Sequence, residues 1–169
     1  TKASDRFDLS RWRVAGNGAD MIRPDVMQAF VDAFASAGFK ASAFLPSYGL
    51  AEATLAVSLM PPGEGIRVEL VEETELSGMS HGEDRPQRYR AIVNCGKPVR
   101  DMEVVVREED GTPLPDGAIG KLWCRGPSVM VGYFRDQDAT DACLVDGWLD
   151  TGDMAYLSND YIYIVGRAK

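Results

Sequence analysis

The sequence predicts an α/β fold in two parts, the end of an α/β subdomain followed by a small, mostly antiparallel β subdomain. Two observations carry this prediction. Apolar residues recur at helical spacing early in the chain, and alternation of apolar and polar residues replaces that spacing after Pro61-Pro62-Gly63. The chain has 169 residues, of which 45% are hydrophobic, which suffices for a packed core. We therefore expect an α+β fragment with little helix in its second half.

The first part, residues 1–60, contains one clear helix. Pro24 suits the first position of a helix, and Asp25 suits the positive end of the helix dipole. Gly38 suits the end of the helix. Apolar residues repeat at three-four spacing between these points, at Val26, Ala29, Phe30, Ala33, Phe34 and Ala37. The pattern predicts a helix between Pro24 and Gly38.

A strand, a tight loop and a second helix are expected next. The apolar run 41–45 predicts a strand that stops at Pro46, and helix-forming residues resume at Ala51. Ligands of α/β sheets lie at the carboxyl ends of strands, and helix N-termini favour anions. We therefore expect Tyr48 and Glu52 to lie near a site.

The rest of the chain is expected to be mostly β. Residues 61–93 contain a long polar excursion, 72–88, and residues 94–169 form the predicted β subdomain. Turn signals of the Asp-Gly type separate the strands. The expected elements are strands at 66–70, 90–93, 102–107, 119–125 and 161–165, and a short helix at 137–144.

Composition excludes several classes of protein. Eighteen basic against 26 acidic residues give a net charge of −8, so the chain offers no basic footprint for nucleic acid. The nearly uncharged stretch 41–62 contains Pro46 and Glu52 and does not fit a membrane span. The three cysteines form no C-x-x-C pair, which argues against a disulfide framework or a zinc site. We expect a reduced, cytoplasmic protein, in which the lone His81 does not favour a histidine-assisted nucleophile.

Three segments each allow a chemical and a structural interpretation. Tyr48 and Glu52 suit a stacked base and a hard cation, or packing alone. Asp153 follows Thr-Gly, where its carboxylate can accept hydrogen bonds from a vicinal diol or merely cap a turn. The cations Arg167 and Lys169 suit an anion or a solvated end.

Taken together and in order, these segments resemble the adenylate-forming superfamily of acyl-CoA synthetases, peptide-synthetase adenylation domains and luciferases. The resemblance covers nearly the whole chain. It rests on Tyr-Gly-Leu-Ala-Glu at 48–52, Gly-Lys-Leu-Trp-Cys-Arg-Gly-Pro-Ser-Val-Met-Val-Gly-Tyr at 120–133, Thr-Gly-Asp at 151–153 and Gly-Arg-Ala-Lys at 166–169. Two features are similar to the fatty acyl-AMP ligases: Ala51 stands where most members have Thr, and 61–93 is long enough for the insertion typical of that branch.

The resemblance implies a role for each matching residue. It places Tyr48 and the adjacent Gly49 against adenine and Asp153 on the ribose hydroxyls. It places Arg167 near the ribose and phosphate, and it gives Glu52 the catalytic role of holding Mg²⁺ against the ATP phosphates.

The segment with Gly18, Ala19 and Asp20 resembles the loop that meets the edge of adenine in this family. The ligases usually have Asn-Gly-Ala-Glu-Pro there, so Asp20 and Met21 depart from the pattern. A shorter carboxylate at Asp20 is expected to weaken a contact with the base.

The implied activity is the activation of a fatty acid by ATP to an acyl-adenylate and pyrophosphate, followed by transfer to the acyl carrier protein of a polyketide or peptide synthase. The alternatives are a fatty acyl-CoA synthetase and a non-catalytic interaction module. The family's phosphate loop and its catalytic lysine are not in this sequence. We therefore expect a fragment of the large N-terminal domain, ending at the hinge to an absent C-terminal domain and inactive alone.

Overall fold

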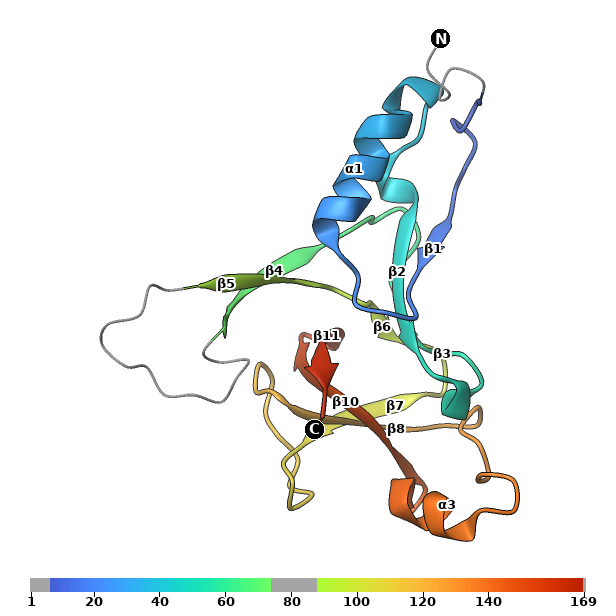
Figure 1. Ribbon diagram of the computed structural model, residues 1–169, viewed down its shortest axis with the longest axis vertical. Helices are drawn as coiled ribbons and strands as arrows, with labels where there is room; N and C mark the ends of the chain where they lie inside the picture. Colours follow the sequence, from blue (N-terminus) through green and yellow to red (C-terminus); the bar gives the residue numbers. More distant parts are fainter. Residues whose placement is uncertain (1–6, 74–87, 169) are drawn as a thin grey trace.

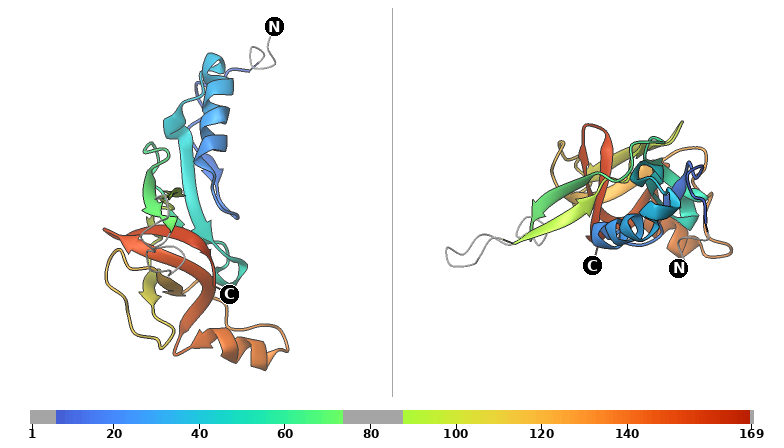
Figure 2. Two further views of the ribbon diagram at one scale, coloured as in Figure 1. Left: turned by 60° about the vertical axis from the view of Figure 1, so that its left-hand side comes forward. Right: turned by 90° about the horizontal axis from the view of Figure 1, so that it is seen from above.

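The computed structural model describes residues 7–73 and 88–168. Figure 1 shows two β-rich layers with α1 at one end and α3 at the other. The upper layer is a sheet of order β1-β2-β3-β6, and the lower one has the order β11-β10-β8-β7 with β9 beside β10. The β4–β5 hairpin projects from the side between them, which is clearest in the view from above in Figure 2. The predicted fold class is confirmed, whereas the boundaries at residues 60 and 93 stay a prediction.

The upper layer begins with a parallel pair joined by a helix. β1 (Ala15–Asn17) pairs in parallel with β2 (Phe44–Gly49), and α1 (Pro24–Phe34) lies between them in sequence. α1 continues as a 3-10 turn, Ala35–Ala37, and Gly38 follows with φ 83°. The predicted helix is thus confirmed. Its apolar face packs on the strands in a small core with the buried residues Ala15, Met27, Phe39, Ala43 and Phe44.

The prediction for the segment after Pro46 was wrong. A 3-10 turn, Ala41–Ala43, leads into β2, which runs through Pro46 to Gly49, and the Met60 amide donates to the Pro46 carbonyl at 2.9 Å. The expected second helix is only a 3-10 turn, Ala51–Ala53, before β3 (Ala56–Leu59). Antiparallel pairing of β3 with β2 prevails over helix propensity here. The helix N-terminus expected to favour an anion is therefore absent at this point of the described chain.

The lower layer is an antiparallel sheet. Its strands are β7 (Glu103–Arg107), β8 (Gly120–Arg125), β9 (Leu144–Val145), β10 (Trp148–Ser158) and β11 (Tyr161–Arg167), and α3 (Gln137–Cys143) precedes β9. The strands predicted at 102–107, 119–125 and 161–165 and the short helix are confirmed. One face of this sheet packs on Ala53 and Val57 of the upper layer. The two layers are therefore packed on each other through this shared cluster, while the upper layer keeps its own small core around α1.

Turn chemistry follows the sequence signals. Asp146 and Gly147 both have positive φ, 51° and 77°, as a type I′ turn requires. A turn without glycine joins β10 to β11, where Asn159 and Asp160 have φ of 51° and 67°. Asn and Asp tolerate this left-handed conformation better than other side chains.

The remaining strands form a hairpin and a short edge. β4 (Val68–Glu72) pairs with β5 (Tyr89–Val93), and β6 (Lys97–Pro98) extends the upper sheet beside β3. Of the predicted excursion 72–88, residues 74–87 lie outside the described residues. None of the helices in the described part of the chain is long and apolar enough to cross a membrane.

The packing of β2 against β3 can be tested by a substitution at Gly49. A Cβ at Gly49 would lie 1.6 Å from the Leu55 carbonyl oxygen, so no side chain fits without backbone movement. We expect Gly49→Ala to lower the free energy of unfolding by about 3 kcal/mol or more. A Cβ at Gly16 has no heavy atom within 4 Å, so Gly16→Ala is the matched control. Equal urea denaturation curves for the two variants would contradict the packing at Gly49.

Candidate functional site

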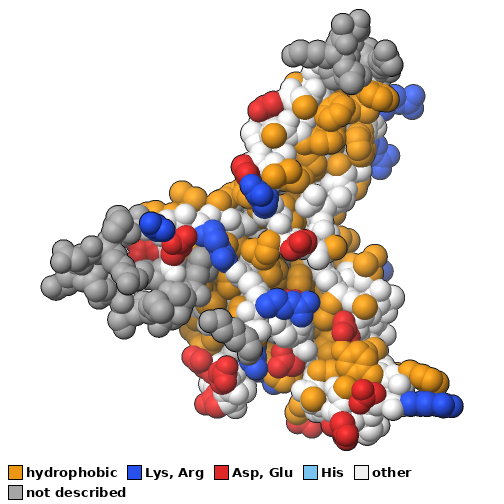
Figure 3. All heavy atoms as spheres, in the orientation of Figure 1, with side chains coloured by type: hydrophobic (Ala, Val, Ile, Leu, Met, Phe, Trp, Pro, Cys, Tyr) orange, Lys and Arg blue, Asp and Glu red, His pale blue; other side chains and the backbone are white. Residues whose placement is uncertain are grey.

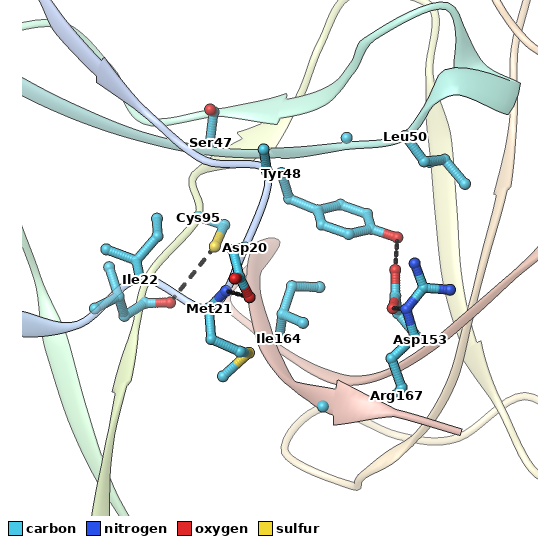
Figure 4. A pocket seen from close by; sticks show the side chains of 14 residues that line it. Asp20, Met21, Ile22, Ser47, Tyr48, Leu50, Cys95, Asp153, Ile164 and Arg167 are labelled. Atoms are coloured by element: carbon cyan, nitrogen blue, oxygen red, sulfur yellow. Dashed lines mark hydrogen bonds and ion pairs between the residues drawn. The ribbon is translucent and has the colours of Figure 1, made fainter. Parts of the chain in front are cut away.

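A pocket of about 250 Å³ opens where the two layers meet (Figure 4). The loop after β1, the end of β2, the residues around the end of β5, and the facing strands β10 and β11 enclose it. Its lining residues are Ala19, Asp20, Met21, Ile22, Ser47, Tyr48, Gly49, Leu50, Val93, Cys95, Asp153, Ile164, Gly166 and Arg167. Of the residues predicted for a site, Ala19, Asp20, Tyr48, Gly49, Asp153 and Arg167 thus lie around one space.

Tyr48, Asp153 and Arg167 form the polar wall of this pocket. The Tyr48 hydroxyl donates to Oδ2 of Asp153 at 2.6 Å, and Nε of Arg167 lies 3.1 Å from Oδ1. Figure 4 shows the Tyr48 side chain, from β2, pointing toward Asp153 and Arg167, which come from the paired strands β10 and β11. Burial, and then the hydrogen bond to Asp153, raise the pKa of Tyr48 well above its usual range, so the hydroxyl stays a donor. Asp153 is only 8% exposed, and its carboxylate is paired on both oxygens.

An irregularity in β10 brings Asp153 to this place. Three β10 residues, 151–153, lie opposite the single β8 residue Leu122. The Thr151 hydroxyl donates to the Leu122 carbonyl at 2.8 Å, and Gly152 has φ 69°. Bulges of this kind re-aim side chains. The Thr-Gly-Asp motif is therefore part of a distorted strand, and the alternative of a simple capped turn was wrong.

The loop 17–20 reaches the pocket because Gly18 passes close to β2. A Cβ at Gly18 would lie 2.7 Å from the Ser47 hydroxyl oxygen, and that hydroxyl donates to the Asn17 carbonyl at 3.1 Å. Gly18 itself does not line the pocket, but its close approach places Ala19 and Asp20 at the rim. Asp20 Oδ1 accepts from the Met21 amide at 2.6 Å, which folds the short carboxylate back on the loop.

Glu52 lies apart from the pocket lining. The Tyr133 hydroxyl donates to Oε1 of Glu52 at 2.6 Å, and the Glu52 carbonyl accepts from the Met130 amide at 2.7 Å. The hydrogen bond from Tyr133 holds the pKa of Glu52 below its usual range, whereas Glu52 raises the pKa of Tyr133 to about 12. An ionised carboxylate on the surface fits a hard cation that has further ligands from elsewhere. In the described residues no three His, Cys, Asp or Glu side chains cluster as a metal site.

The sequence reasoning missed several lining residues, among them the buried Val93 and Cys95. The Cys95 side chain faces the pocket, and burial raises the pKa of its thiol to about 11. Ile164 and Gly166 come from the strand that carries Arg167. Alternation from Arg167 would point to Val165 instead of Ile164, because the ladder of β10 and β11 is irregular at Val165. All three cysteines are free thiols.

Charges of both signs are mixed on the face shown in Figure 3. Lys and Arg side chains stand beside Asp and Glu there, with apolar areas between them. On the part of this face that the structure describes, basic side chains are thus separated by acidic and apolar ones.

Comparison with known proteins finds a matching protein family and several relatives. Residues 1–134 match the family described as AMP-binding enzyme. A provisionally named acyl-CoA synthetase of Caulobacter vibrioides is 44% identical over 98% of this chain and 30% of its own length. The medium-chain-fatty-acid–[acyl-carrier-protein] ligase JamA of Moorena producens is 35% identical over 96% of this chain and 30% of its own.

Solved structures agree with the fold. A structure from a study of fatty acyl-adenylate ligases of E. coli and L. pneumophila matches 97% of this chain with TM-score 0.86 and 38% identity. A fatty acyl-adenylate ligase of L. pneumophila in complex with acyl adenylate and pyrophosphate matches 96% with TM-score 0.83 and 30% identity. The match covers 30% of each of these two chains, so the present chain spans about 30% of the length of its relatives.

The contact between Tyr48 and Asp153 can be tested by a double-mutant cycle. Asp153→Ala removes the acceptor of a buried hydroxyl and is expected to lower the free energy of unfolding by about 2 kcal/mol. Tyr48→Phe, which keeps the ring, is expected to lower the free energy of unfolding by less than Asp153→Ala does. The double variant is expected to be more stable than the sum of the two predicts, because neither unpaired partner remains. Additive effects in urea denaturation would mean that the hydrogen bond does not form.

Proposed function

We propose that this chain, which belongs to the AMP-binding enzyme family, forms part of the nucleotide site of an enzyme that activates a fatty acid with ATP. One observation carries the proposal. A buried carboxylate, a tyrosine and an arginine from different strands meet at a pocket of about 250 Å³. The relatives are named as an acyl-CoA synthetase, a medium-chain-fatty-acid ligase to an acyl carrier protein and fatty acyl-adenylate ligases, and these names support a fatty acid as the substrate.

The reaction forms one bond and breaks one. A carboxylate oxygen of the fatty acid attacks the α-phosphorus of ATP in line, the bond between that phosphorus and the bridging oxygen breaks, and pyrophosphate leaves with the electron pair. No side chain has to take a proton, because a carboxylate is the nucleophile at neutral pH. Catalysis is then mainly positioning and charge stabilisation, and histidine is not required.

Each pocket residue has a task in this scheme. Asp153 accepts hydrogen bonds from the ribose hydroxyls, since its carboxylate is fixed between Tyr48 and Arg167. The Tyr48 ring forms a wall for adenine, with Gly49 beside it. Arg167, whose side chain is 80% exposed, reaches from Asp153 toward the phosphate. Ala19 and Asp20, placed by Gly18, contact the edge of the base.

Glu52 is the residue of this chain that would hold Mg²⁺ together with the ATP phosphates. Its carboxylate is ionised, exposed to ligands and oriented by Tyr133, which fits a cation that prefers oxygen ligands. When bound, Mg²⁺ supplies stabilisation of charge on the phosphates.

The acceptor of the acyl group is proposed to be the thiol of an acyl carrier protein. JamA, which is named as a ligase to an acyl carrier protein, supports this choice. CoA is the second candidate, because the Caulobacter relative is named as an acyl-CoA synthetase. An interaction module without activity is the third.

The test uses the full-length parent protein with ATP, Mg²⁺ and a panel of fatty acids, with CoA or a carrier protein as acceptor. Without an acceptor, mass spectrometry is expected to detect acyl-AMP. With an acceptor present, the acylated form of the carrier protein is expected in preference to acyl-CoA. Asp153→Ala is expected to lower kcat/KM for ATP by about a hundredfold, because ribose hydroxyls lose a charged acceptor. If wild type binds AMP but makes no acyl-AMP, the protein is an interaction module.

Glu52→Gln keeps the shape of the side chain and removes its charge. The Mg²⁺ concentration that gives half-maximal adenylation is expected to rise about tenfold in the parent protein. Glu108→Gln, at an exposed residue after β7, is the matched control. Mn²⁺ affinity, measured by the electron paramagnetic resonance of the free ion, is the readout that does not depend on turnover. Equal affinities in Glu52→Gln and wild type would remove Glu52 from the metal site.

A further inference from the structure

The outer edge of β11 is held by the chain that follows β5. β11 pairs with β10 on its inner side. On the outer side the Cys95 amide donates to the Ile162 carbonyl and the Ile162 amide donates to the Gly96 carbonyl, each at 2.9 Å. Further along, Arg90 of β5 donates from Nη2 to the Val165 carbonyl. An edge strand is thereby covered along much of its length.

Val165 is the point where the β10–β11 ladder is irregular. Met154 lies opposite Gly166 and the next β10 residue, Ala155, lies opposite Ile164. Val165 is therefore an extra residue of β11 with no β10 partner, which defines a bulge. Bulges leave the extra residue out of the ladder and turn the strand locally. Arg90 supplies the hydrogen bond that the Val165 carbonyl accepts.

A second contact joins the β4–β5 hairpin to the same pair of strands. The rings of Tyr156 and Tyr163 stack with centroids 4.7 Å apart and are 4% and 5% exposed. The Tyr156 hydroxyl donates to Glu69 of β4 at 2.8 Å, and the Asn94 amide donates to the Tyr163 hydroxyl at 2.9 Å. Burial, and then Glu69, raise the pKa of Tyr163 to about 12, so its hydroxyl keeps its proton.

The contact of Arg90 lies close to the pocket, because Val165 stands between the lining residues Ile164 and Gly166. Arg167 follows the bulge by two residues and pairs directly with Asp153, and the Ala168 amide donates to the Gly152 carbonyl at 2.9 Å. The side chain of Arg167 is 80% exposed and has little packing to fix it. Its guanidinium is held by the ion pair with Asp153, and the backbone between Val165 and Ala168 sets where the side chain starts.

We propose that the β4–β5 hairpin positions Arg167 against Asp153 for the nucleotide, and that Arg90 and Glu69 are positioning residues of the site. This inference rests on the proposed function. Without the Arg90 donor the bulge at Val165 loses its outer hydrogen bond, while the apolar contacts of Ile92 and Val71 with Tyr156 and Tyr163 keep the hairpin attached. We expect the strand to keep its place, while the backbone at the bulge shifts and Arg167 meets Asp153 in a less favourable geometry.

The experiment uses the full-length parent protein and the variant Arg90→Met. The KM for ATP and the dissociation constant of AMP, measured by calorimetry, are expected to rise about five- to tenfold, because a hydrogen bond from a charged donor is lost. The KM for fatty acid is expected to stay within about twofold of wild type. Arg90→Lys keeps one charged donor and is expected to retain part of the AMP affinity that Arg90→Met loses. Glu69→Gln is expected to lower the AMP affinity less than Arg90→Met does. Arg100→Met, at an exposed arginine after β6, is the control.

A double-mutant cycle shows whether Arg90 acts through Arg167. In an Arg167→Ala background, Arg90→Met is expected to change AMP affinity by less than about twofold. Additive effects, an equal change in the KM for fatty acid, or the same change in Arg100→Met would overturn the inference. If Arg90→Met does not fold, Arg90→Lys and Glu69→Gln decide by the same readouts.

Failure of the proposed function is distinguishable from failure of this inference. The proposed function fails if wild type makes no acyl-AMP, or if Asp153→Ala leaves the kinetics for ATP unchanged. The inference alone fails if Asp153→Ala acts as expected while Arg90→Met and Glu69→Gln bind AMP as wild type does.

Discussion

The hydrogen bond from Tyr48 to Asp153 is the constraint on which the candidate site depends. It joins the end of β2 in the upper sheet to β10 in the lower sheet, across 105 residues of sequence. A carboxylate that is 8% exposed is stable only if its oxygens find donors, and Tyr48 and Arg167 are those donors. The pocket therefore lies where the two sheets meet, and the contacts of the Asp153 carboxylate join the sheets there.

The geometry of that meeting comes from departures from regular β structure. The register shift before Met154 aims Asp153 at the pocket, and the bulge at Val165 sends Arg167 back toward it. Regular alternation would place neighbouring side chains of β10 on opposite faces of the sheet. The buried core below, with Leu122 and Ile162 fully covered, holds the regular parts of both strands in place. Rigid packing thus supports a site built from the irregular parts.

The sequence predicted elements wherever one face of a strand or helix is buried. Periodicity identified α1 and the strands β7, β8 and β11, since their buried faces require it. It failed at Pro46 and Ala51, because antiparallel pairing with β3 decides that segment and pairing is not a local property. The motif residues Tyr48, Asp153 and Arg167 were identified by resemblance. Their convergence depends on two bulges and a covered strand edge, for which the local sequence gives no signal.

The charges around the pocket indicate which part of a nucleotide this segment can recognise. Among the described residues that line it, Arg167 is the only cation, and Asp20 and Asp153 are acidic. Two carboxylates suit the hydroxyl and amino donors of a nucleoside, whereas a triphosphate requires several positive charges. Arg167 is also shared with Asp153, so it cannot neutralise phosphate by itself. In the proposed function, the chain would therefore hold the base and ribose, and stabilisation of the phosphates would rest on the proposed metal ion and on cations outside this pocket.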